Sequence, residues 1–233
     1  MSSPQSDGKS RPIPNALTIA GVDPSGGAGI LADVKAMSAL GAYGCAVIAA
    51  LTAQNTQGVT GISPVPPDFV GLQIDTLFTD VRIDAVKIGM LGQKPVIQVV
   101  AEKLAKWAPA HVVLDPVMVA KSGDLLLERE AVGAMREAML PQATLLTPNL
   151  PEAGVLLEER PVETVKEMRR VAERLRNKMA HSGQRWVMVK GGHLPGNETI
   201  DLLHDGDRMI ELPGHRIDCL LYTSDAADDS LRV

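Results

Sequence analysis

Short apolar runs alternate with stretches of helical periodicity along most of the chain, and this alternation restricts the fold more than any other feature. The runs have strand length, and they end in glycine, proline or amide side chains. A repeated strand and helix order requires right-handed crossovers and gives a mostly parallel sheet with helices on both faces. We therefore predict an α/β fold with strands at residues 16–20, 43–52, 85–90, 111–116, 144–148 and 186–192.

Apolar residues recur at helical spacing between these runs. Within the second helix we expect Phe69, Leu72 and Leu77 on the inner face. Near the end of the chain, residues 199–204 and 208–212 flank an Asp-Gly-Asp turn, which is typical of a hairpin and predicts an antiparallel extension of the sheet. The expected helices span residues 30–40, 66–78, 96–107, 129–140 and 165–179, with a short one starting at Pro151.

The composition agrees with this fold class and excludes several partners. Hydrophobic residues make up 45% of the chain but aromatic residues only 3%, so the core must consist of aliphatic side chains and methionine. With a net charge of −5 and no basic block, we expect neither nucleic acid nor a membrane as a partner. Cys45 and Cys219 imply no disulfide framework, which favours a cytoplasmic location. Residues 1–14 are polar and are expected to form a disordered leader.

A glycine-rich loop, Gly21 to Gly29, connects the first predicted strand to the first helix. Exposed backbone amides at a helix N-terminus favour a polar or anionic ligand, although tight packing alone would also require such a loop. Residues 27–32 match the relaxed dinucleotide pattern G-x-G-x-x-A, but no acidic residue closes the second strand, which argues against a Rossmann-type oxidoreductase. Asp23 and Asp33 are expected to face one cleft beside this loop.

Polar residues also follow the other predicted strands. In open α/β sheets, ligands bind beyond the carboxyl ends of the strands, so convergence on that edge predicts a single site. Each residue has a structural alternative, and Asn149 and Glu152 in particular match a capping box. The residues are Gly21, Asp23, Gln54, Asn55, Gly89, Met90, Asp115, Asn149, Glu152, Lys190, Gly191 and Gly192.

This set of residues suits phosphoryl transfer, which depends on positioned charge more than on covalent catalysis. Glu152 could hold Mg²⁺ through a water molecule, and Lys190 could contact phosphates. The chain has neither a Walker A sequence nor a protein-kinase signature, which excludes those two types of kinase.

Eight motifs follow one another in a specific order, among them Gly-Val-Asp-Pro-Ser-Gly-Gly-Ala-Gly, Thr-Ala-Gln-Asn, Lys-Ile-Gly-Met and Val-Lys-Gly-Gly-His. Together they resemble the bacterial hydroxymethylpyrimidine/phosphomethylpyrimidine kinase family of thiamine biosynthesis, within the ribokinase superfamily. The resemblance covers residues 15–218 and implies a ribokinase-like three-layer fold. The motifs occupy residues 16–30, 40–44, 52–56, 87–91, 113–118, 120–124, 147–153 and 189–193.

The resemblance implies two successive ATP-dependent phosphorylations. The first modifies the hydroxymethyl group of 4-amino-5-hydroxymethyl-2-methylpyrimidine, and the second converts the monophosphate to the pyrophosphate. At matching positions it implies a pyrimidine site formed by Gln54, Gly21, Asp33, Met90 and Val117. It also implies a site for ATP and Mg²⁺, with Lys190 and Asn149 at the nucleotide and Glu152 and Asp115 at the metal.

After the position of Asp218, family members continue with Asn-Thr-His-Gly-Thr-Gly-Cys, which supplies the anion hole and the catalytic base. This chain instead runs from Cys219 to Val233 without a glycine and resembles translated sequencing-adaptor read-through. We therefore expect residues 15–218 to be a kinase domain that is incomplete at its C-terminus, residues 219–233 to be a non-native tail, and no catalytic residue to be assignable. Cys219 is not equated with the family cysteine.

Two alternatives to the pyrimidine kinase remain open besides the oxidoreductase. Related kinases accept pyridoxal or pyridoxine, which would keep the reaction and change the ring. A fragment that lacks the anion hole could also act as a non-catalytic pyrimidine-binding module. The family tends to form homodimers, so we expect a homodimer here.

Overall fold

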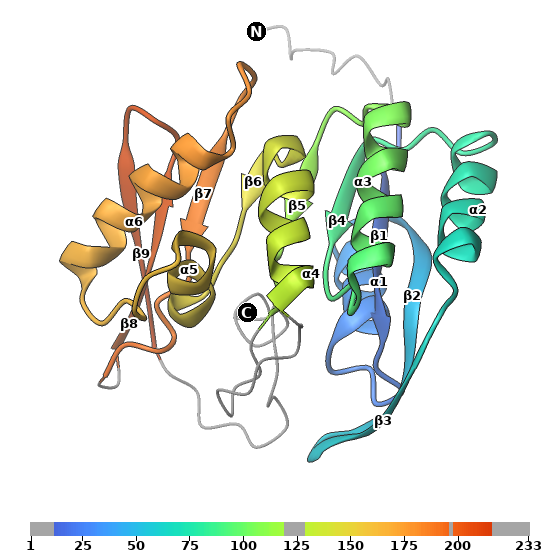
Figure 1. The fold of residues 1–233 in the computed structure, drawn as a ribbon, viewed down its shortest axis with the longest axis horizontal. Helices are drawn as coiled ribbons and strands as arrows, with labels where there is room; N and C mark the ends of the chain where they lie inside the picture. Colours follow the sequence, from blue (N-terminus) through green and yellow to red (C-terminus); the bar gives the residue numbers. More distant parts are fainter. Residues whose placement is uncertain (1–11, 119–128, 196–197, 216–233) are drawn as a thin grey trace, which may run out of the picture.

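The computed structural model describes residues 12–118, 129–195 and 198–215. The expected tail, 219–233, and most of the expected leader lie outside these residues. The described residues form one nine-stranded sheet in the order β3-β2-β1-β4-β5-β6-β7-β8-β9 (Figure 1). The strands are β1 (Asn15–Val22), β2 (Tyr43–Asn55), β3 (Gly58–Pro64), β4 (Ala85–Ile88), β5 (Val112–Leu114), β6 (Leu145–Leu146), β7 (Trp186–Val189), β8 (Glu198–His204) and β9 (Met209–His215).

The centre of the sheet is parallel and both of its margins are antiparallel. β1 pairs in parallel with β2 and β4, and the parallel ladder continues through β5, β6 and β7. β8 and β9 add antiparallel strands at one margin, which confirms the expected extension. At the other margin β3 pairs antiparallel with β2, and the sequence analysis did not predict this strand.

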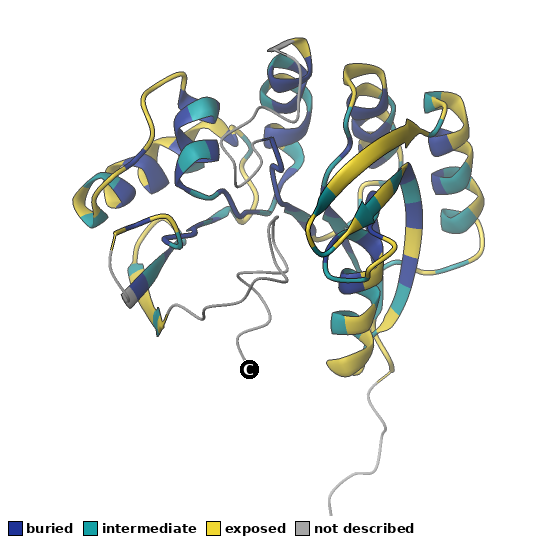
Figure 2. Cartoon of the chain, turned by 90° about the horizontal axis from the view of Figure 1, so that it is seen from below, coloured by how far each residue is buried: buried dark blue, intermediate teal, exposed yellow. Residues whose placement is uncertain are grey.

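The helices cover the two faces of the sheet unequally. Five of the described helices, α2 to α6, lie on one face and α1 lies on the other (Figures 1 and 2).

The expected helix at 129–140 is α-helical only to Ala134, and continues as a π-helical turn and a 3₁₀ turn that contains Pro141. The helices are α1 (Gly29–Ala39), α2 (Pro67–Phe78), α3 (Lys94–Trp107), α4 (Arg129–Ala134), α5 (Leu150–Leu157) and α6 (Val165–Lys178).

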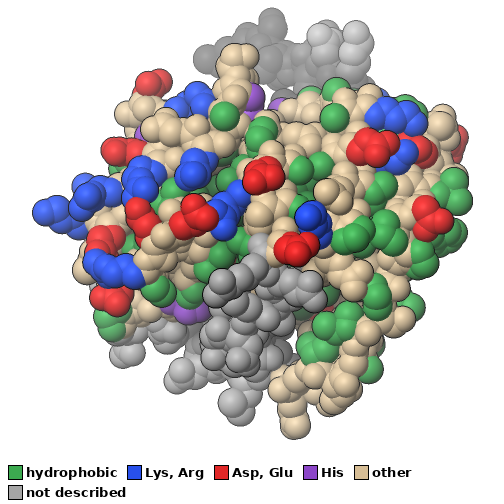
Figure 3. Space-filling view, in the orientation of Figure 1, with side chains coloured by type: hydrophobic (Ala, Val, Ile, Leu, Met, Phe, Trp, Pro, Cys, Tyr) green, Lys and Arg blue, Asp and Glu red, His purple; other side chains and the backbone are tan. Residues whose placement is uncertain are grey.

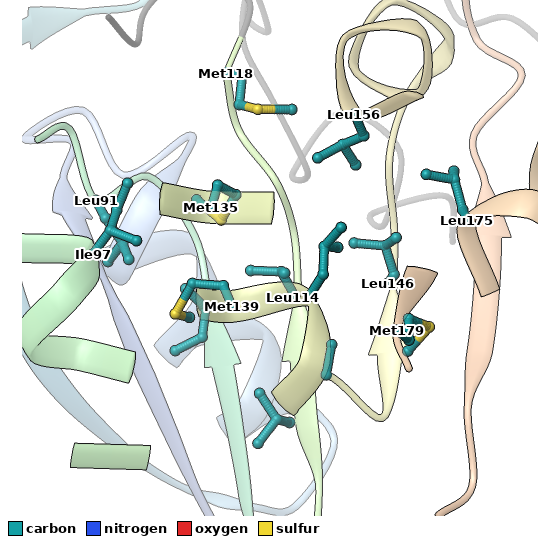
Figure 4. Close-up of a cluster of buried hydrophobic side chains, with 14 of the residues drawn as sticks. Leu91, Ile97, Leu114, Met118, Met135, Met139, Leu146, Leu156, Leu175 and Met179 are labelled. Atoms are coloured by element: carbon teal, nitrogen blue, oxygen red, sulfur yellow. The ribbon is translucent and has the colours of Figure 1, made fainter. Parts of the chain in front are cut away.

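One apolar core lies between the sheet and the helices α2 to α6. It is built from aliphatic side chains and methionine, as the low aromatic content required (Figure 4). The apolar stripe expected along residues 165–179 faces this core in α6, and Thr164 caps the helix by accepting a hydrogen bond from the Glu167 amide. Gly41 follows the C-cap of α1, and its φ of +80° suits a glycine.

The expected inner face of α2 is wrong at two of its three positions. Phe69 and Leu72 are 53% and 57% exposed, whereas Val70 and Ile74 are fully buried. Leu77 packs against the core as expected. The helix carries two apolar stripes, and only the one through 70, 74 and 77 extends along its whole length, so this stripe faces the sheet.

A glutamine side chain closes part of the open edge of β2. β3 pairs only with residues 50–55 of β2, so the first half of the strand has no described strand on that side. Gln73 of α2 reaches this edge: its Oε1 accepts from the Ile48 amide at 3.0 Å, and its Nε2 donates to the Ile48 carbonyl at 3.1 Å. The amide therefore pairs with β2 as a strand backbone would.

On the face that carries α1, the sheet is less covered at β5 to β7. Val113, Leu145 and Met188 alternate with fully buried core residues, and they are only half-buried. Figure 2 shows α1 beneath the β1 side of the sheet and no other described helix on this face. Among the described residues, no helix has the length and apolarity needed to cross a membrane.

Candidate active site

A buried ion pair lies where β5 and β7 end. The side chains of Asp115 and Lys190 are 2% and 5% exposed, and Lys190 Nζ lies 3.1 Å from Asp115 Oδ1. Thr147, which follows β6, donates its hydroxyl to the same oxygen at 3.1 Å. The carboxyl ends of three neighbouring parallel strands thus bring together residues that are 75 positions apart.

The second oxygen of Asp115 has no partner in the described part of the chain. Oδ2 is buried, and no described donor lies within hydrogen-bonding distance of it. A buried carboxylate oxygen without a partner is costly, and such atoms occur where a cation, a water or a ligand donor completes the site. The carboxylate therefore fits a role beside a metal ion.

Asn149 and Glu152 form the capping box of α5, so the structural interpretation of this motif is correct. Asn149 Oδ1 accepts from the Glu152 amide, and Glu152 Oε2 accepts from the Asn149 amide, both at 2.9 Å. Glu152 Oε1 also lies 3.4 Å from the Met118 amide. Each carboxylate oxygen has two lone pairs, so a contact with a metal through water remains compatible with these bonds.

The capping box and the ion pair belong to one group of residues. The Lys190 amide donates to the Pro148 carbonyl at 2.9 Å, and a parallel bridge joins Asn149 to Lys190. Val117, which is 5% exposed, lies in the same segment as Asp115 and donates its amide to the Asp115 carbonyl. Five of the sequence-predicted residues that follow β5, β6 and β7 are therefore neighbours: Asp115, Val117, Asn149, Glu152 and Lys190.

A second group lies at the ends of β1, β2 and β4. A Cβ added to Gly21 would come 2.9 Å from the methyl carbon of Met90, so the glycine allows this methionine to pack against β1. Thr52 Oγ1 lies 2.8 Å from the Val22 carbonyl and 3.2 Å from Gln54 Oε1, which holds the amide of Gln54 close to the end of β1.

Backbone hydrogen bonds place the two groups on adjacent strands. The Asp115 amide donates to the Ile88 carbonyl at 2.9 Å, and the Gly89 amide donates to the Ile19 carbonyl at 3.0 Å. The carboxyl ends of β1, β4 and β5 are thereby aligned. The strand ends after which most of the predicted polar residues lie therefore form one edge of the sheet.

Asp23 does not face this edge as expected. Its carboxylate is 4% exposed and turns back into its own loop, where it accepts from the amides of Ser25, Gly27 and Ala28 at 2.8 to 3.1 Å. These three amides of the glycine-rich loop, which were expected to be open to a ligand, are therefore occupied by Asp23. Sequence periodicity carries no signal for this contact, although an aspartate that precedes Pro-Ser-Gly-Gly commonly bonds amides two residues further on.

Asp33 is held by two residues that the sequence analysis did not assign. Its Oδ2 accepts from Thr18 Oγ1 at 2.6 Å and from Lys87 Nζ at 3.0 Å. Thr18 lies on β1 and Lys87 on β4, so the carboxylate joins α1 to the two strands that end at Gly21 and Met90. The one sequence signal for this network was a lysine inside an otherwise apolar strand.

A cavity of about 260 Å³ elsewhere in the molecule is not part of this site. Its lining includes His111, Thr144 and His181. His111 and Thr144 precede β5 and β6, so the cavity lies at the amino ends of the strands, opposite the polar edge. The described residues contain no group of three or more His, Cys, Asp or Glu that could hold a metal alone. Mg²⁺ does not need one, because it is usually held by one or two carboxylates together with phosphates and water.

On the helical face, basic and acidic side chains of the described residues are interspersed (Figure 3). Lys and Arg side chains gather over α6, at the left of Figure 3, with acidic side chains between them. Several are ion-paired, such as Arg174 with Glu159 at 2.6 Å and Arg169 with Glu211.

The fold and the polar edge together define a ribokinase-like small-molecule kinase. A crystal structure of phosphomethylpyrimidine kinase from Clostridium difficile 630 superimposes with a TM-score of 0.78 at 40% identity, covering 85% of this chain and 83% of that one. The pyridoxal kinase of Staphylococcus aureus in complex with AMP-PCP and pyridoxal gives a TM-score of 0.77 at 32% identity, covering 87% and 72%.

The chain belongs to the phosphomethylpyrimidine kinase family, whose model matches residues 23–220. The hydroxymethylpyrimidine/phosphomethylpyrimidine kinase of Escherichia coli is 51% identical over 201 residues, which are 85% of this chain and 74% of that protein. The protein of the same name from Rhizobium meliloti is 48% identical over 203 residues, or 87% and 74%. Membership of this family confirms the predicted phosphotransferase class and excludes the oxidoreductase.

Proposed function

We propose that the chain phosphorylates 4-amino-5-hydroxymethyl-2-methylpyrimidine with ATP, and then phosphorylates the monophosphate to the pyrophosphate. Family membership and relatives that are named for both steps support this proposal. The observation that carries it is the buried Asp115–Lys190 pair, with one carboxylate oxygen unpaired, beside the capping box of α5.

At this edge, Lys190 and Asn149 would hold the nucleotide phosphates, and Asp115 and Glu152 would hold Mg²⁺. Magnesium, when bound, neutralises charge on the phosphate oxygens. The unpaired Asp115 oxygen suits direct or water-mediated contact with the ion, whereas Glu152, with two backbone bonds, suits contact through water. Lys190 supplies positive charge in a buried position, where electrostatic stabilisation is stronger than in water.

The pyrimidine would lie at the ends of β1, β2 and β4. The Gln54 amide offers a donor and an acceptor to the edge of the ring, and Met90 offers a polarizable apolar surface against Gly21. Asp33 and Val117 would complete the site. Val117 lies in the segment after β5, where its amide donates to the Asp115 carbonyl.

The test measures ADP release with the hydroxymethylpyrimidine and then with its monophosphate, at matched ATP and Mg²⁺. The proposal expects turnover of both, with the pyrophosphate as the final product by mass. A chain that binds both pyrimidines but never forms a phosphorylated product would instead be the non-catalytic binding module. Binding of neither pyrimidine would contradict the proposal entirely.

A second candidate, a pyridoxal kinase, is favoured by the similarity to the Staphylococcus aureus enzyme. The two candidates differ in the second step, because only the pyrimidine monophosphate is expected to accept a second phosphate. The ratio of kcat/KM for pyridoxal to that for the pyrimidine decides between them. A ratio above one would reverse the preferred assignment.

We further propose that residues 15–218 are an incomplete kinase domain, because the Gly-Thr-Gly-Cys loop of the family does not occur in the sequence. Turnover should then be weak relative to binding, since loss of one preorganised oxyanion site costs about 10²–10³ in rate. The homodimer stays a prediction that sedimentation would test.

A further inference from the structure

Lys87 places a charge in the middle of a strand that is otherwise apolar. β4 reads Ala-Val-Lys-Ile and lies between β1 and β5 within the sheet. The side chains of Lys87 and Asp33 are only 16% and 17% exposed, and their charged atoms are 3.0 Å apart. Replacing a buried ion pair by apolar side chains of similar size is often neutral or stabilising, so stability alone does not explain this pair.

Two donors reach the same oxygen of Asp33. Thr18 and Lys87 both bond Oδ2, at 2.6 and 3.0 Å, and no donor among the described residues bonds Oδ1. An ionised carboxylate accepts hydrogen bonds through both oxygens. The arrangement therefore fixes the orientation of the carboxylate and leaves one charged acceptor for a ligand.

The Lys87 ammonium lies directly against the backbone that leads to Met90. A Cβ added to Gly89 would come 3.0 Å from Lys87 Nζ and 3.0 Å from the Ala20 Cβ. Gly89 precedes Met90, whose methyl carbon packs against Gly21. The ion pair thus lies on the α1 side of the segments proposed to surround the pyrimidine ring.

We propose that Lys87 is a positioning residue that sets substrate specificity, by holding Asp33 so that its Oδ1 accepts a hydrogen bond from an amino group on the substrate ring. The inference rests on the proposed function, because it takes the ring to lie between Gly21 and Met90. A site built to accept such a bond disfavours a ring without the amino group, because the charged acceptor then loses its partner on the ligand.

The test compares Lys87→Met with Lys103→Met. Both substitutions keep side-chain length and remove a charge, and both lysines are 16% exposed and paired with an aspartate. Lys103 pairs with Asp75 between α3 and α2, outside the proposed site. Calorimetric Kd, KM and kcat are measured for the 4-aminopyrimidine alcohol and for the same alcohol without the amino group, and melting is recorded for each variant.

Lys87→Met is expected to weaken binding of the amino compound by about tenfold or more and to change kcat by less than about threefold. Binding of the compound without the amino group should change little. Lys103→Met should lower the melting temperature and leave both dissociation constants as they are. The loss of selectivity, rather than of stability, identifies the positioning role.

Equal weakening for both compounds, or unchanged binding of the amino compound, would overturn the inference. If Lys87→Met does not fold, the near-isosteric Thr18→Val removes the other donor and must show the same selective loss. If the wild-type chain phosphorylates both compounds and binds them with equal dissociation constants, only the role of Lys87 is refuted. A chain that binds neither compound would refute the proposed function.

Discussion

At the scale of single residues, Asp115 and Lys190 form a buried ion pair. Both side chains are almost fully buried and their charged atoms are 3.1 Å apart. Removal of one partner of such a pair leaves an uncompensated buried charge, which is strongly destabilising, while removal of both is tolerated better. Stability and catalysis can therefore be separated by combining two substitutions.

We predict that Lys190→Met lowers the free energy of unfolding by about 3–5 kcal/mol. It should also lower kcat by about 10²-fold or more, because the cation proposed to contact the phosphates is lost. The double variant Asp115→Asn with Lys190→Met should regain most of the stability but none of the activity. Urea unfolding and ADP release measure the two effects, and recovery of activity in the double variant would contradict the proposed role of Lys190.

Asp75 is a second residue whose charge is fixed by its surroundings. Its carboxylate accepts from Lys103 and Lys106 at 2.8 and 2.9 Å and from the Trp107 indole at 2.7 Å. The ring of Trp107 also stacks on Phe78, with centroids 5.3 Å apart. The hydrogen bond from Lys103, followed by those from Lys106 and Trp107, holds the pKa of Asp75 far below its usual value of 3.8.

Because the pKa of Asp75 is lowered by folding, its contribution to stability is present above about pH 4 and is lost as the pH falls towards the folded-state pKa. We predict that Asp75→Asn lowers the melting temperature at pH 7 by roughly 2–6 °C. The difference from the wild type should shrink below pH 4. The exposed Asp80 just beyond α2 provides the control, and an Asp80→Asn variant with the same pH dependence would contradict the assignment.

At the scale of elements, the edge of β2 depends on one side chain of α2. Gln73→Leu would leave the Ile48 amide and carbonyl without their partner. We predict a loss of about 1–3 kcal/mol in the free energy of unfolding, and faster hydrogen exchange at the Ile48 amide. Leu72→Gln on the exposed side of the same helix should change stability by less than about 0.5 kcal/mol. Unchanged exchange at Ile48 would show that Gln73 does not protect the edge.

Most elements could be predicted because their periodicity reflects the surface they bury. The stripe of α6 and the apolar run of β4 are examples, and each corresponds to a face in contact with the core. β3 could not be predicted in this way, because all its residues except the first are exposed and the strand exists only through its pairing with β2. For α2 the sequence offered two stripes, and only tertiary packing selects between them.

The candidate site was predictable to the extent that chain order determines it. Residues that follow parallel strands meet at one edge, and the contact from Asp115 to Lys190 follows from that rule. The contact from Asn149 to Glu152 follows from the capping-box spacing of α5. Contacts between side chains of different elements cannot be predicted from chain order in this way. The convergence of Thr18 and Lys87 on Asp33 has no fixed sequence spacing, and hydrophobic periodicity gives no signal for the burial of Asp23 in its own loop.

At the scale of the whole molecule, Val113, Leu145 and Met188 form a half-buried apolar stripe on the α1 face of the sheet. We propose that the segment which follows residue 218 in the family covers this stripe. The relatives are longer than the matched region, which is 74% of the Escherichia coli protein. An exposed apolar sheet face favours association and aggregation.

We predict that replacing residues 219–233 by the corresponding segment of the Escherichia coli relative raises kcat by about 10²-fold or more, because the family resemblance implies that this segment supplies an oxyanion site. The melting temperature should rise, and fluorescence of a dye that binds exposed apolar surface should fall. A version of the same segment with its Gly-Thr-Gly loop changed to alanines should keep the gain in stability without the gain in rate. Equal activity of the original and the extended chains would refute the incomplete-domain proposal.

The outer strands of the sheet, β3 and β9, also determine how the native protein can aggregate. β3 contains Gly58, Gly61 and Pro64, and β9 contains Pro213 and Gly214. Proline has no N–H to offer to an incoming strand and glycine weakens pairing, so both outer strands are poor templates for a foreign backbone. At high protein concentration the native chain should therefore form amorphous aggregates through side-chain contacts. Fibrils with the 4.7 Å spacing between strands should not grow from the native state.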